Sequence, residues 1–324
     1  MDGKSMIKHV FLLNPVAGKG VKQQGLRERI EQVCTDRGVD FEIHQTSARG
    51  EATEYVRALC EQYPDTQLRF YACGGDGTLS EAVNGAYGYA NAAVGVIPVG
   101  TGNDFVRNFE GKERFLDIGA QLDGQTHMLD LMQYNGQLCV NMINIGFDCE
   151  VVKLTAKLKN SKLLPANMGY IAGLVLTLIR KPGVKAYVSV DGGEVQRRKM
   201  LLTSVANGSW CGGGFRSSPL ALLSDGVLDV LLIKNVTRIR FVSLVKKYKA
   251  GSFVDDPKAR RVIDYVKGRT VRYTFDGLQS ICVDGEVVET QELEISAVRE
   301  ALCLIVPEGA AYLPAVDPMP VGVY

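Results

Sequence analysis

The chain has 324 residues, of which 46% are apolar and 23% charged, and its net charge is +1 at pH 7. These values are typical of a soluble globular protein with one or two domains, and they give no basic field that would indicate a nucleic-acid partner. The longest apolar run, YIAGLVLTLI at residues 170–179, is far shorter than the ~20 residues that span a bilayer, so we expect no transmembrane segment.

The eight cysteines show no Cys-x-x-Cys pair and no regular spacing. This predicts reduced core residues in a cytoplasmic protein rather than a disulfide framework. The three histidines are scattered and join no Cys/His cluster, so the sequence supports no zinc site. The apolar run near the N-terminus is too short for the h-region of a signal peptide, and we expect no secretion signal.

Short apolar runs alternate with helical patterns over the first 128 residues. Strands are predicted at 10–13, 39–44, 67–73 and 94–99, and helices at 24–34, at 51–62 and from about residue 79. Strand–helix alternation with short loops predicts a parallel sheet that is covered on both faces. Residues 1–128 are therefore expected to form an α/β domain.

From about residue 129 the pattern changes to strands joined by tight turns. The dipeptides Asn135-Gly136, Asp191-Gly192 and Asp284-Gly285 are those favoured by two-residue hairpin loops. Helical segments at about 151–179 and 239–250 interrupt the strands. We expect an antiparallel β-rich domain at 129–307, followed at 308–324 by an extended, Pro-rich tail that is available to complete the first domain.

Three glycine-rich loops follow predicted strands of the first domain: NPVAGKG at 14–20, GGDGT at 74–78 and GTGND at 100–104. In a parallel sheet such loops gather at the carboxyl ends of the strands, where ligands bind. Glycine allows close approach of the backbone, and free N–H groups at a helix start attract anions. Each loop alone could be an ordinary tight turn, but three together predict a phosphate-binding site.

Two better-known phosphate motifs do not match these loops. The stretch GDGTLS lacks the third glycine of a dinucleotide-binding GxGxxG fingerprint, and the glycines near Lys19 do not fit GxxxxGK[ST]. A dinucleotide Rossmann site is poorly supported, and a P-loop is excluded.

Asp76 places a carboxylate inside the second loop, where it would repel a phosphate unless a divalent cation lay between them. Mg²⁺ takes carboxylates together with substrate phosphates. We therefore expect Asp76 to face a magnesium–nucleotide complex, with Asp104 reinforcing the same metal network. Lys19 is expected to neutralise phosphate charge.

GGDGTLSEAVNG, followed by PVGTGNDFVRNF, resembles the catalytic domain of the diacylglycerol kinase family, which includes bacterial lipid kinases and is related to the sphingosine and ceramide kinases. NPVAGKG resembles the first nucleotide loop of that family. SPLALLSDG at 218–226 resembles its SPxAxxxDG element, and VDGE at 283–286 resembles its catalytic turn. GGDGT is shared with NAD kinases, so the resemblance depends on the whole set of motifs.

The resemblance implies an α/β N-terminal nucleotide-binding domain plus a C-terminal antiparallel β-sandwich domain that holds the lipid acceptor. It implies transfer of the γ-phosphoryl of ATP to a lipid hydroxyl, foremost diacylglycerol to phosphatidic acid, with ATP and Mg²⁺ as cofactors. A structural Mg²⁺ would be held by Asp225 and the main-chain carbonyls of Leu222 and Val227, and Asp284 or Glu286 would be the general base. The implied ATP-site residues are Asn14, Pro15, Gly18, Lys19, Thr46, Gly74, Gly75, Asp76, Gly77, Thr78, Leu79, Ser80, Glu81, Thr101, Asn103 and Asp104.

Some of these features have simpler interpretations. Asp-Gly is a common hairpin turn and recurs at 191–192, 225–226 and 276–277, so the turn at 284–285 could be purely structural. Lysines at 153, 157, 159 and 162 precede YIAGLVLTLI, and Arg180-Lys181 follow it. This segment could dock on anionic lipid or be a core helix with solvated lysines, and the basic cluster at 246–249 is interpreted as a solvated helix face.

Two other functions compete with a lipid kinase. One is an NAD kinase-like phosphorylation of a soluble acceptor, and the other is a nucleotide or lipid sensor without catalysis. The expected partners are a lipid substrate at the membrane surface and no nucleic acid, with peripheral contact at the inner face of the membrane. A homodimer is a further alternative that the sequence leaves open.

Overall fold

The computed structural model describes residues 7–18, 25–147, 149–151, 153–154 and 183–312, and the chain divides into two compact units. Unit 1 contains the described residues up to Leu131 and those from Val298 onward, and unit 2 contains Met132–Ala297. The sequence analysis assigns 298–307 to the second domain. The structure returns the chain to unit 1 at Val298 because the last part of strand β14 (Glu286–Val306) lies beside strand β4 (Ala92–Pro98).

Unit 1 is built on a parallel sheet. Strands β1 (Ile7–Leu13), β2 (Asp40–Gln45), β3 (Gln67–Gly74) and β4 lie in the order β4-β3-β1-β2, and β14 adds parallel to β4 at the outer edge. All seven residues of β4 are buried, as expected for a strand that is covered on both faces.

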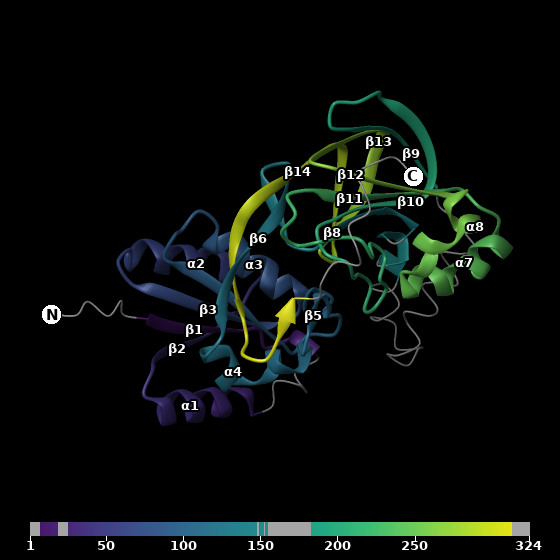
Figure 1. Ribbon diagram of the computed structural model, residues 1–324. Coiled ribbons are helices and arrows are strands. Elements are labelled where there is room, and N and C mark those ends of the chain that lie inside the picture. The colour runs from purple at the N-terminus through teal and green to yellow at the C-terminus, as the bar shows by residue number, and fades with distance from the viewer. Residues whose placement is uncertain (1–6, 19–24, 148, 152, 155–182, 313–324) are drawn as a thin grey trace. The chain divides into compact units, whose positions relative to one another are not determined.

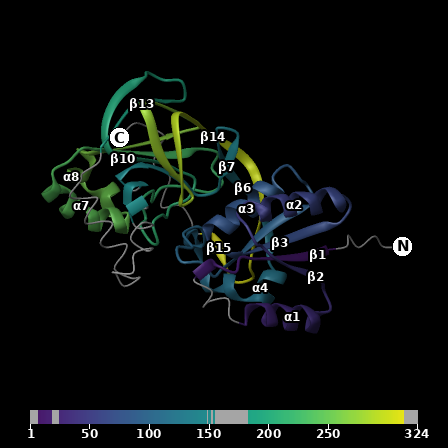
Figure 2. The same ribbon diagram turned by 180° about the vertical axis from the view of Figure 1, so that it is seen from behind.

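Helices cover both faces of this sheet. Helices α1 (Leu26–Arg37) and α4 (Ile118–Leu122) lie on one face, and α2 (Glu51–Gln62) and α3 (Asp76–Ala86) lie on the other, as Figure 1 and the reverse view in Figure 2 show. In α1 the buried residues recur at helical spacing, Leu26, Ile30 and Cys34, and they pack with Phe11 and Tyr71 of the sheet.

Short elements complete unit 1. The 3₁₀ helices η2 (Phe105–Asn108) and η3 (Lys112–Leu116) flank the two-residue strand β5 (Phe109–Glu110), which pairs with β15 (Ala311–Tyr312). The rings of Phe109 and Tyr312 meet edge to face at 5.7 Å. The described part of the predicted tail thus lies in unit 1.

Unit 2 is antiparallel and β-rich, as the sequence predicts. Its strands follow the order β12-β11-β10-β8-β13-β14, and β9 pairs with both β10 and β13. Aliphatic and aromatic side chains that alternate along these strands form one buried core around Tyr273, Ile143 and Val230. The strands are β6 (Gln125–Tyr134), which begins in unit 1, β7 (Gln137–Cys139), β8 (Met142–Gly146), β9 (Val184–Val190), β10 (Gln196–Ala206), β11 (Leu228–Lys234), β12 (Ile263–Gly268) and β13 (Thr270–Val283).

The hairpin turns predicted from Asn-Gly and Asp-Gly are confirmed. Asn135, Asp191 and Asp284 have φ of 45°, 50° and 45°, and each following glycine also has a positive φ. Two successive positive φ angles define the type I′ turn, whose twist matches that of the flanking strands.

Three helices of unit 2 lie beside the sheet: α7 (Arg238–Ala250), η4 (Ser252–Asp255) and α8 (Pro257–Arg260). α7 begins within one residue of the predicted start and ends where predicted. The helix predicted at 151–179 lies largely outside the described residues.

All eight cysteines are free thiols in the structure and seven are buried, so their predicted place in the core is confirmed. Within the described ranges, no group of three or more His, Cys, Asp or Glu side chains is arranged to hold a metal ion. No helix of the described chain combines the length and the apolarity needed to cross a bilayer.

Candidate active site

The carboxyl ends of the four parallel strands of unit 1 lie level with one another. Leu13 is in register with Gln45 and with Cys73, and Gly74 is in register with Pro98. The three predicted glycine-rich loops therefore meet at one edge of the sheet. Thr46 also lies at this edge, because it follows β2 and its N–H bonds to the carbonyl of Leu13 at 2.9 Å.

The second and third loops touch through their backbones. The N–H of Gly100 donates to the carbonyl of Gly74 at 2.9 Å. A Cβ at Gly100 would lie 2.4 Å from the Cα of Gly75, and one at Gly74 would lie 2.1 Å from Oγ1 of Thr78. Side chains at these positions would collide, so the glycines are required by the close approach of the loops themselves.

Asp76 ties the two loops together. Its carboxylate accepts the N–H of Asp104 and that of Phe105, each at 3.1 Å, at the start of η2. Two backbone donors therefore accommodate the charge of this carboxylate within the protein, and its contact with magnesium stays a prediction. Asp104 in turn forms an ion pair of 3.3 Å with Nε of Arg107.

Other predicted residues hold the first loop and the loop after β2. Nδ2 of Asn14 donates to Oγ1 of Thr78 at 3.0 Å, which joins the β1 loop to α3. The carboxylate of Glu81 accepts the N–H of Gly50 at 2.9 Å, which fixes the chain before α2. Asn103, with φ of 51°, donates from Nδ2 to the carbonyl of Pro98 at 2.9 Å.

Not every predicted residue can contact a ligand. Leu79 has a side chain that is 1% exposed, and its N–H bonds to the carbonyl of Gly75, so the structure does not support it as an ATP contact. Lys19 lies outside the described residues. The remaining predicted residues lie in the three loops, at Thr46, or in the first turns of α3: Pro15, Gly18, Gly77, Ser80 and Thr101.

The edge is suited to an anion such as a phosphate group. Helix α3 begins at Asp76 with no side-chain cap, and the first N–H groups of an α-helix have no partner within the helix. Such N–H groups, with the positive end of the helix dipole, bind anions.

In unit 2 the turn of Asp284 is tightly held. Its carboxylate accepts the N–H of Val140 at 2.7 Å and the N–H groups of Asn141 and Met142 at 3.0 Å each. The thiol of Cys139 is a fourth donor at 3.2 Å. Burial raises the pKa of Asp284, although these donors oppose the shift.

The same arrangement occurs at the Asp191 turn, which belongs to none of the predicted functional motifs. There the carboxylate accepts the N–H of Arg269 at 2.7 Å and that of Thr270 at 2.8 Å. In two turns of this unit, therefore, the aspartate of an Asp-Gly hairpin accepts hydrogen bonds from the backbone of a neighbouring segment between strands. At Asp284 these bonds hold the turn against the segment before β8. Glu286, by contrast, is exposed at the first position of β14.

Asp225 belongs to a charged network. Its carboxylate accepts the N–H of Val227 at 3.2 Å and the ammonium of Lys267 at 3.1 Å. The same ammonium donates to the carbonyl of Leu220 at 2.9 Å and pairs with buried Asp229 at 3.3 Å. Burial raises the pKa of Asp229 to about 6. For Lys267, burial acts to lower the pKa, but Asp229 and Asp225 outweigh it and raise the pKa.

This network bears on the expected metal. One carboxylate and two main-chain carbonyls are hard oxygen donors of the type that Mg²⁺ accepts, with waters to complete the shell. The donors predicted at Asp225, Leu222 and Val227 are of this chemical type, and in the structure the carboxylate of Asp225 binds Lys267. A cation there would share the carboxylate of Asp225 with Lys267.

Sequence reasoning missed several of these groups. Lys267, Asp229 and Tyr265 lie in no recognised motif, and they meet because β11 and β12 pair with Asp229 opposite Lys267. Tyr265 donates to Asp229 at 2.6 Å. The available signal was the charge of Asp229 beside the apolar run VLLI of β11.

Comparison with known families identifies both units. Residues 8–134 match the model of the diacylglycerol kinase catalytic domain, and residues 141–306 match that of the YegS C-terminal NAD kinase beta sandwich-like domain.

Curated relatives match most of the chain. The "Diacylglycerol kinase" of Bacillus subtilis is 26% identical over 280 residues, which cover 85% of this chain and 88% of the relative. A "Probable lipid kinase YegS-like" of Citrobacter koseri is 28% identical over 306 residues, which cover 90% and 94%.

Solved structures share the fold. A crystal structure of a diacylglycerol kinase from Bacillus anthracis str. Sterne has a TM-score of 0.66 at 21% identity and covers 93% of this chain and 97% of its own. An NAD kinase from Archaeoglobus fulgidus in complex with ATP has a TM-score of 0.50 at 14% identity and covers 94% of each chain. At these identities the likeness concerns the fold alone.

Proposed function

Because the chain belongs to the family that joins a diacylglycerol kinase catalytic domain to a YegS C-terminal beta sandwich-like domain, we propose that it is an ATP-dependent lipid kinase. It transfers the γ-phosphoryl of ATP to a lipid hydroxyl, foremost that of diacylglycerol, and so produces phosphatidic acid. The observation that carries the proposal is the sheet edge formed by the carboxyl ends of the parallel strands of unit 1. There, hydrogen bonds join the three glycine-rich loops around the start of α3.

In this proposal unit 1 holds the nucleotide. The first N–H groups of α3 and the backbone of Gly75 receive the phosphates. Asn14 and Asp76 keep the loops in place, together with the bond from Gly100 to Gly74. Phosphoryl transfer depends on positioning and charge neutralisation more than on covalent chemistry. Mg²⁺, when bound, supplies that neutralisation at the phosphates and, at Asp225, stabilises the second unit.

Unit 2 supplies the general base. Glu286 takes the proton of the acceptor hydroxyl while the hydroxyl oxygen forms a bond to the γ-phosphorus. The bond between the γ-phosphorus and the β–γ bridging oxygen breaks, and ADP leaves. Asp284 positions the turn, because its oxygens already receive four donors. A base must come within about 3 Å of the hydroxyl in the complex with substrate.

The test is a phosphorylation assay with labelled ATP and lipid in mixed micelles. Diacylglycerol, sphingosine, ceramide and phosphatidylglycerol are offered separately, and labelled phosphatidic acid is the expected product. A labelled product with NAD and none with any lipid would establish the NAD kinase-like alternative, to which the fold of the second unit is related. Thermal shifts with ATP but no labelled product from any acceptor would indicate a sensor.

A lipid acceptor requires contact with a membrane. We propose a peripheral association with the inner face of the cytoplasmic membrane.

A further inference from the structure

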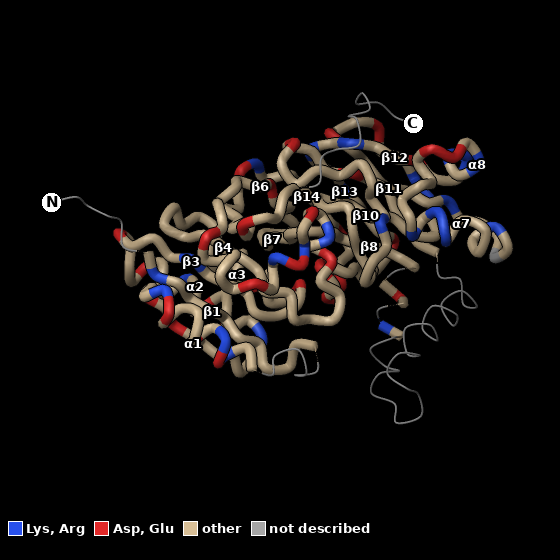
Figure 3. Tube along the Cα trace, turned by 60° about the horizontal axis from the view of Figure 1, so that its bottom comes forward, with Lys and Arg blue, Asp and Glu red and all other residues tan. Residues whose placement is uncertain are grey.

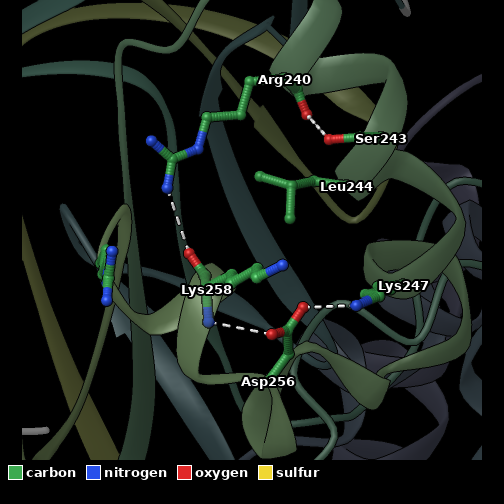
Figure 4. A pocket seen from close by; sticks show the side chains of 7 residues that line it. Arg240, Ser243, Leu244, Lys247, Asp256 and Lys258 are labelled. Atoms are coloured by element: carbon green, nitrogen blue, oxygen red, sulfur yellow. Dashed lines mark hydrogen bonds and ion pairs between the residues drawn. The ribbon is translucent and has the colours of Figure 1, made fainter.

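A pocket of about 420 Å³ lies in unit 2 beside α7 and α8. Four cationic side chains and one carboxylate line it together with two uncharged residues, and Figure 4 shows how they surround the opening. The lining residues are Arg240, Ser243, Leu244, Lys247, Asp256, Lys258 and Arg261.

The only carboxylate among the lining residues is already occupied by the protein. Asp256 accepts the N–H of Lys258 at 2.9 Å and the ammonium of Lys247 at 2.5 Å. The hydrogen bond from Lys247 is the chief reason that the pKa of Asp256 is lowered. Asp256 therefore neutralises Lys247 and leaves the charges of the other three cations in the pocket.

Those cations are held open to solvent. Arg240 donates from Nη2 to the carbonyl of Lys258 at 3.2 Å, which fixes its guanidinium at the rim without neutralising it. Arg240, Lys258 and Arg261 are all exposed, and the described chain brings no carboxylate into an ion pair with them. A planar guanidinium beside an ammonium is well suited to a phosphate group.

Two exposed aliphatic side chains lie on the neighbouring face of α7. Arg240, Ser243, Leu244 and Lys247 follow the spacing of one helix face, and they line the pocket. Ile239 and Val242 lie on the adjacent face, where they are 85% and 56% exposed. Figure 3 shows lysines and arginines gathered along α7 and α8.

We propose that α7 and this pocket form the docking site for an anionic phospholipid surface. The phosphate of a headgroup enters the pocket between Arg240, Lys258 and Arg261, while Ile239 and Val242 enter the interfacial layer. The two exposed aliphatic side chains favour a lipid over free phosphate, because they offer nothing to an inorganic anion and gain from leaving water. From the sequence alone, the basic cluster of this helix at 246–249 indicated only a solvated face.

This inference rests on the proposed lipid acceptor, but its test measures binding and not phosphorylation. Full-length protein is sedimented with phosphatidylcholine vesicles, with and without phosphatidic acid. We expect binding only to the anionic vesicles. With about 1 kcal/mol for each surface cation, Arg240→Gln together with Lys258→Gln should weaken it roughly 25-fold. Ile239→Ser with Val242→Ser should weaken it on both phosphatidic acid and phosphatidylglycerol vesicles.

Matched controls lie on the exposed β9–β10 hairpin of the same unit. Lys185→Gln with Lys199→Gln removes two exposed cations, and Val195→Ser removes an aliphatic side chain that is 61% exposed. Neither should change binding. Equal losses in the control and pocket variants, or full binding of the Arg240/Lys258 double variant, would overturn the site.

A further arm separates the two sources of phosphate. If inorganic phosphate protects the protein against heat through Arg240 and Lys258 while no vesicle binds, the pocket serves a soluble anion and the lipid assignment fails. Phosphorylation of a short-chain, soluble diacylglycerol is measured in parallel. If the wild-type protein phosphorylates the soluble lipid but binds no vesicle, only the docking site is contradicted, whereas vesicle binding without phosphorylation contradicts only the kinase.

Discussion

The carboxylate of Asp284 accepts a 2.7 Å hydrogen bond from the backbone N–H of Val140, although 144 positions separate the two residues. The bond fixes the turn between β13 and β14 against the segment that enters β8. Through it, the position of Glu286 depends on the connection between β7 and β8.

Replacing Asp284 by Asn is expected to lower the free energy of unfolding by about 1–3 kcal/mol, because the amide places N–H donors against N–H donors. Activity should fall with it. Asp191→Asn should cost less stability and leave phosphorylation unchanged, because this exposed carboxylate accepts two N–H groups instead of four donors and lies in no predicted functional motif. Urea unfolding and the micelle assay are measured on both variants.

Glu286→Gln separates catalysis from positioning. The side chain is exposed, so the unfolding free energy should change by less than about 0.5 kcal/mol. Loss of the general base should lower kcat by about 10²–10⁴-fold with little change in KM for ATP. The opposite outcome would make Asp284 the base. In that case Glu286→Gln keeps the wild-type kcat, and Asp284→Asn loses kcat even after correction for its folded fraction.

Asp76→Asn tests the bond between the two glycine-rich loops. The variant loses an ionised acceptor for the N–H groups of Asp104 and Phe105, so unit 1 should be destabilised by about 1–3 kcal/mol even without nucleotide. Asp65→Asn, at an exposed turn of the same unit, is the control. Unchanged stability of nucleotide-free Asp76→Asn would mean that the carboxylate serves only a bound cation.

Gly100→Ala should push the second and third loops apart. The new Cβ would lie 2.4 Å from the Cα of Gly75, which is backbone and cannot rotate away. We expect the stabilisation of the protein by ATP, read as a thermal shift, to be largely lost. Gly277→Ala, where a Cβ meets nothing within 4 Å, should keep the full shift.

Asp229 gives a pH dependence of known sign. Its pKa rises from about 3.8 in the unfolded chain to about 6 in the folded one, so the folded protein holds the extra proton between these values. The contribution of Asp229 is therefore greatest below pH ~4 and is lost as the pH rises through ~6. By linkage the loss is about 3 kcal/mol.

The measurement is urea unfolding of wild type and Asp229→Asn at a series of pH values. From pH ~4 to ~6 the unfolding free energy of the wild type should decline relative to that of the variant. Parallel curves over this range would show that Asp229 is ionised in the fold throughout.

Local patterns predicted much of this molecule. Asn135-Gly136 and Asp284-Gly285 specify their turns because glycine and a short polar residue accept positive φ. The three loops could be placed at one edge because parallel strands of similar length end together. In these cases the determining contacts lie within a few residues of the motif.

The features that the sequence did not predict depend on contacts between residues far apart in the chain. Nothing near Asp76 indicates that its oxygens would meet N–H groups 28 and 29 residues later. The backbone within β14 is a similar case. Glu300 has a φ of 49°, which a non-glycine residue seldom adopts, and its N–H bonds to the buried Asp130 at 2.9 Å. Neither residue type signals this backbone conformation.

The late return of β14 has a consequence for synthesis on the ribosome. The outer edge of β4 lacks its neighbour until the stretch around Leu304 has emerged, after the whole of unit 2. At elongation speeds of about 5–20 residues per second, this edge of the nascent sheet stays unpaired for on the order of 10–40 s. During that interval it is open to misassembly, and chaperones that bind nascent chains have their greatest opportunity to act.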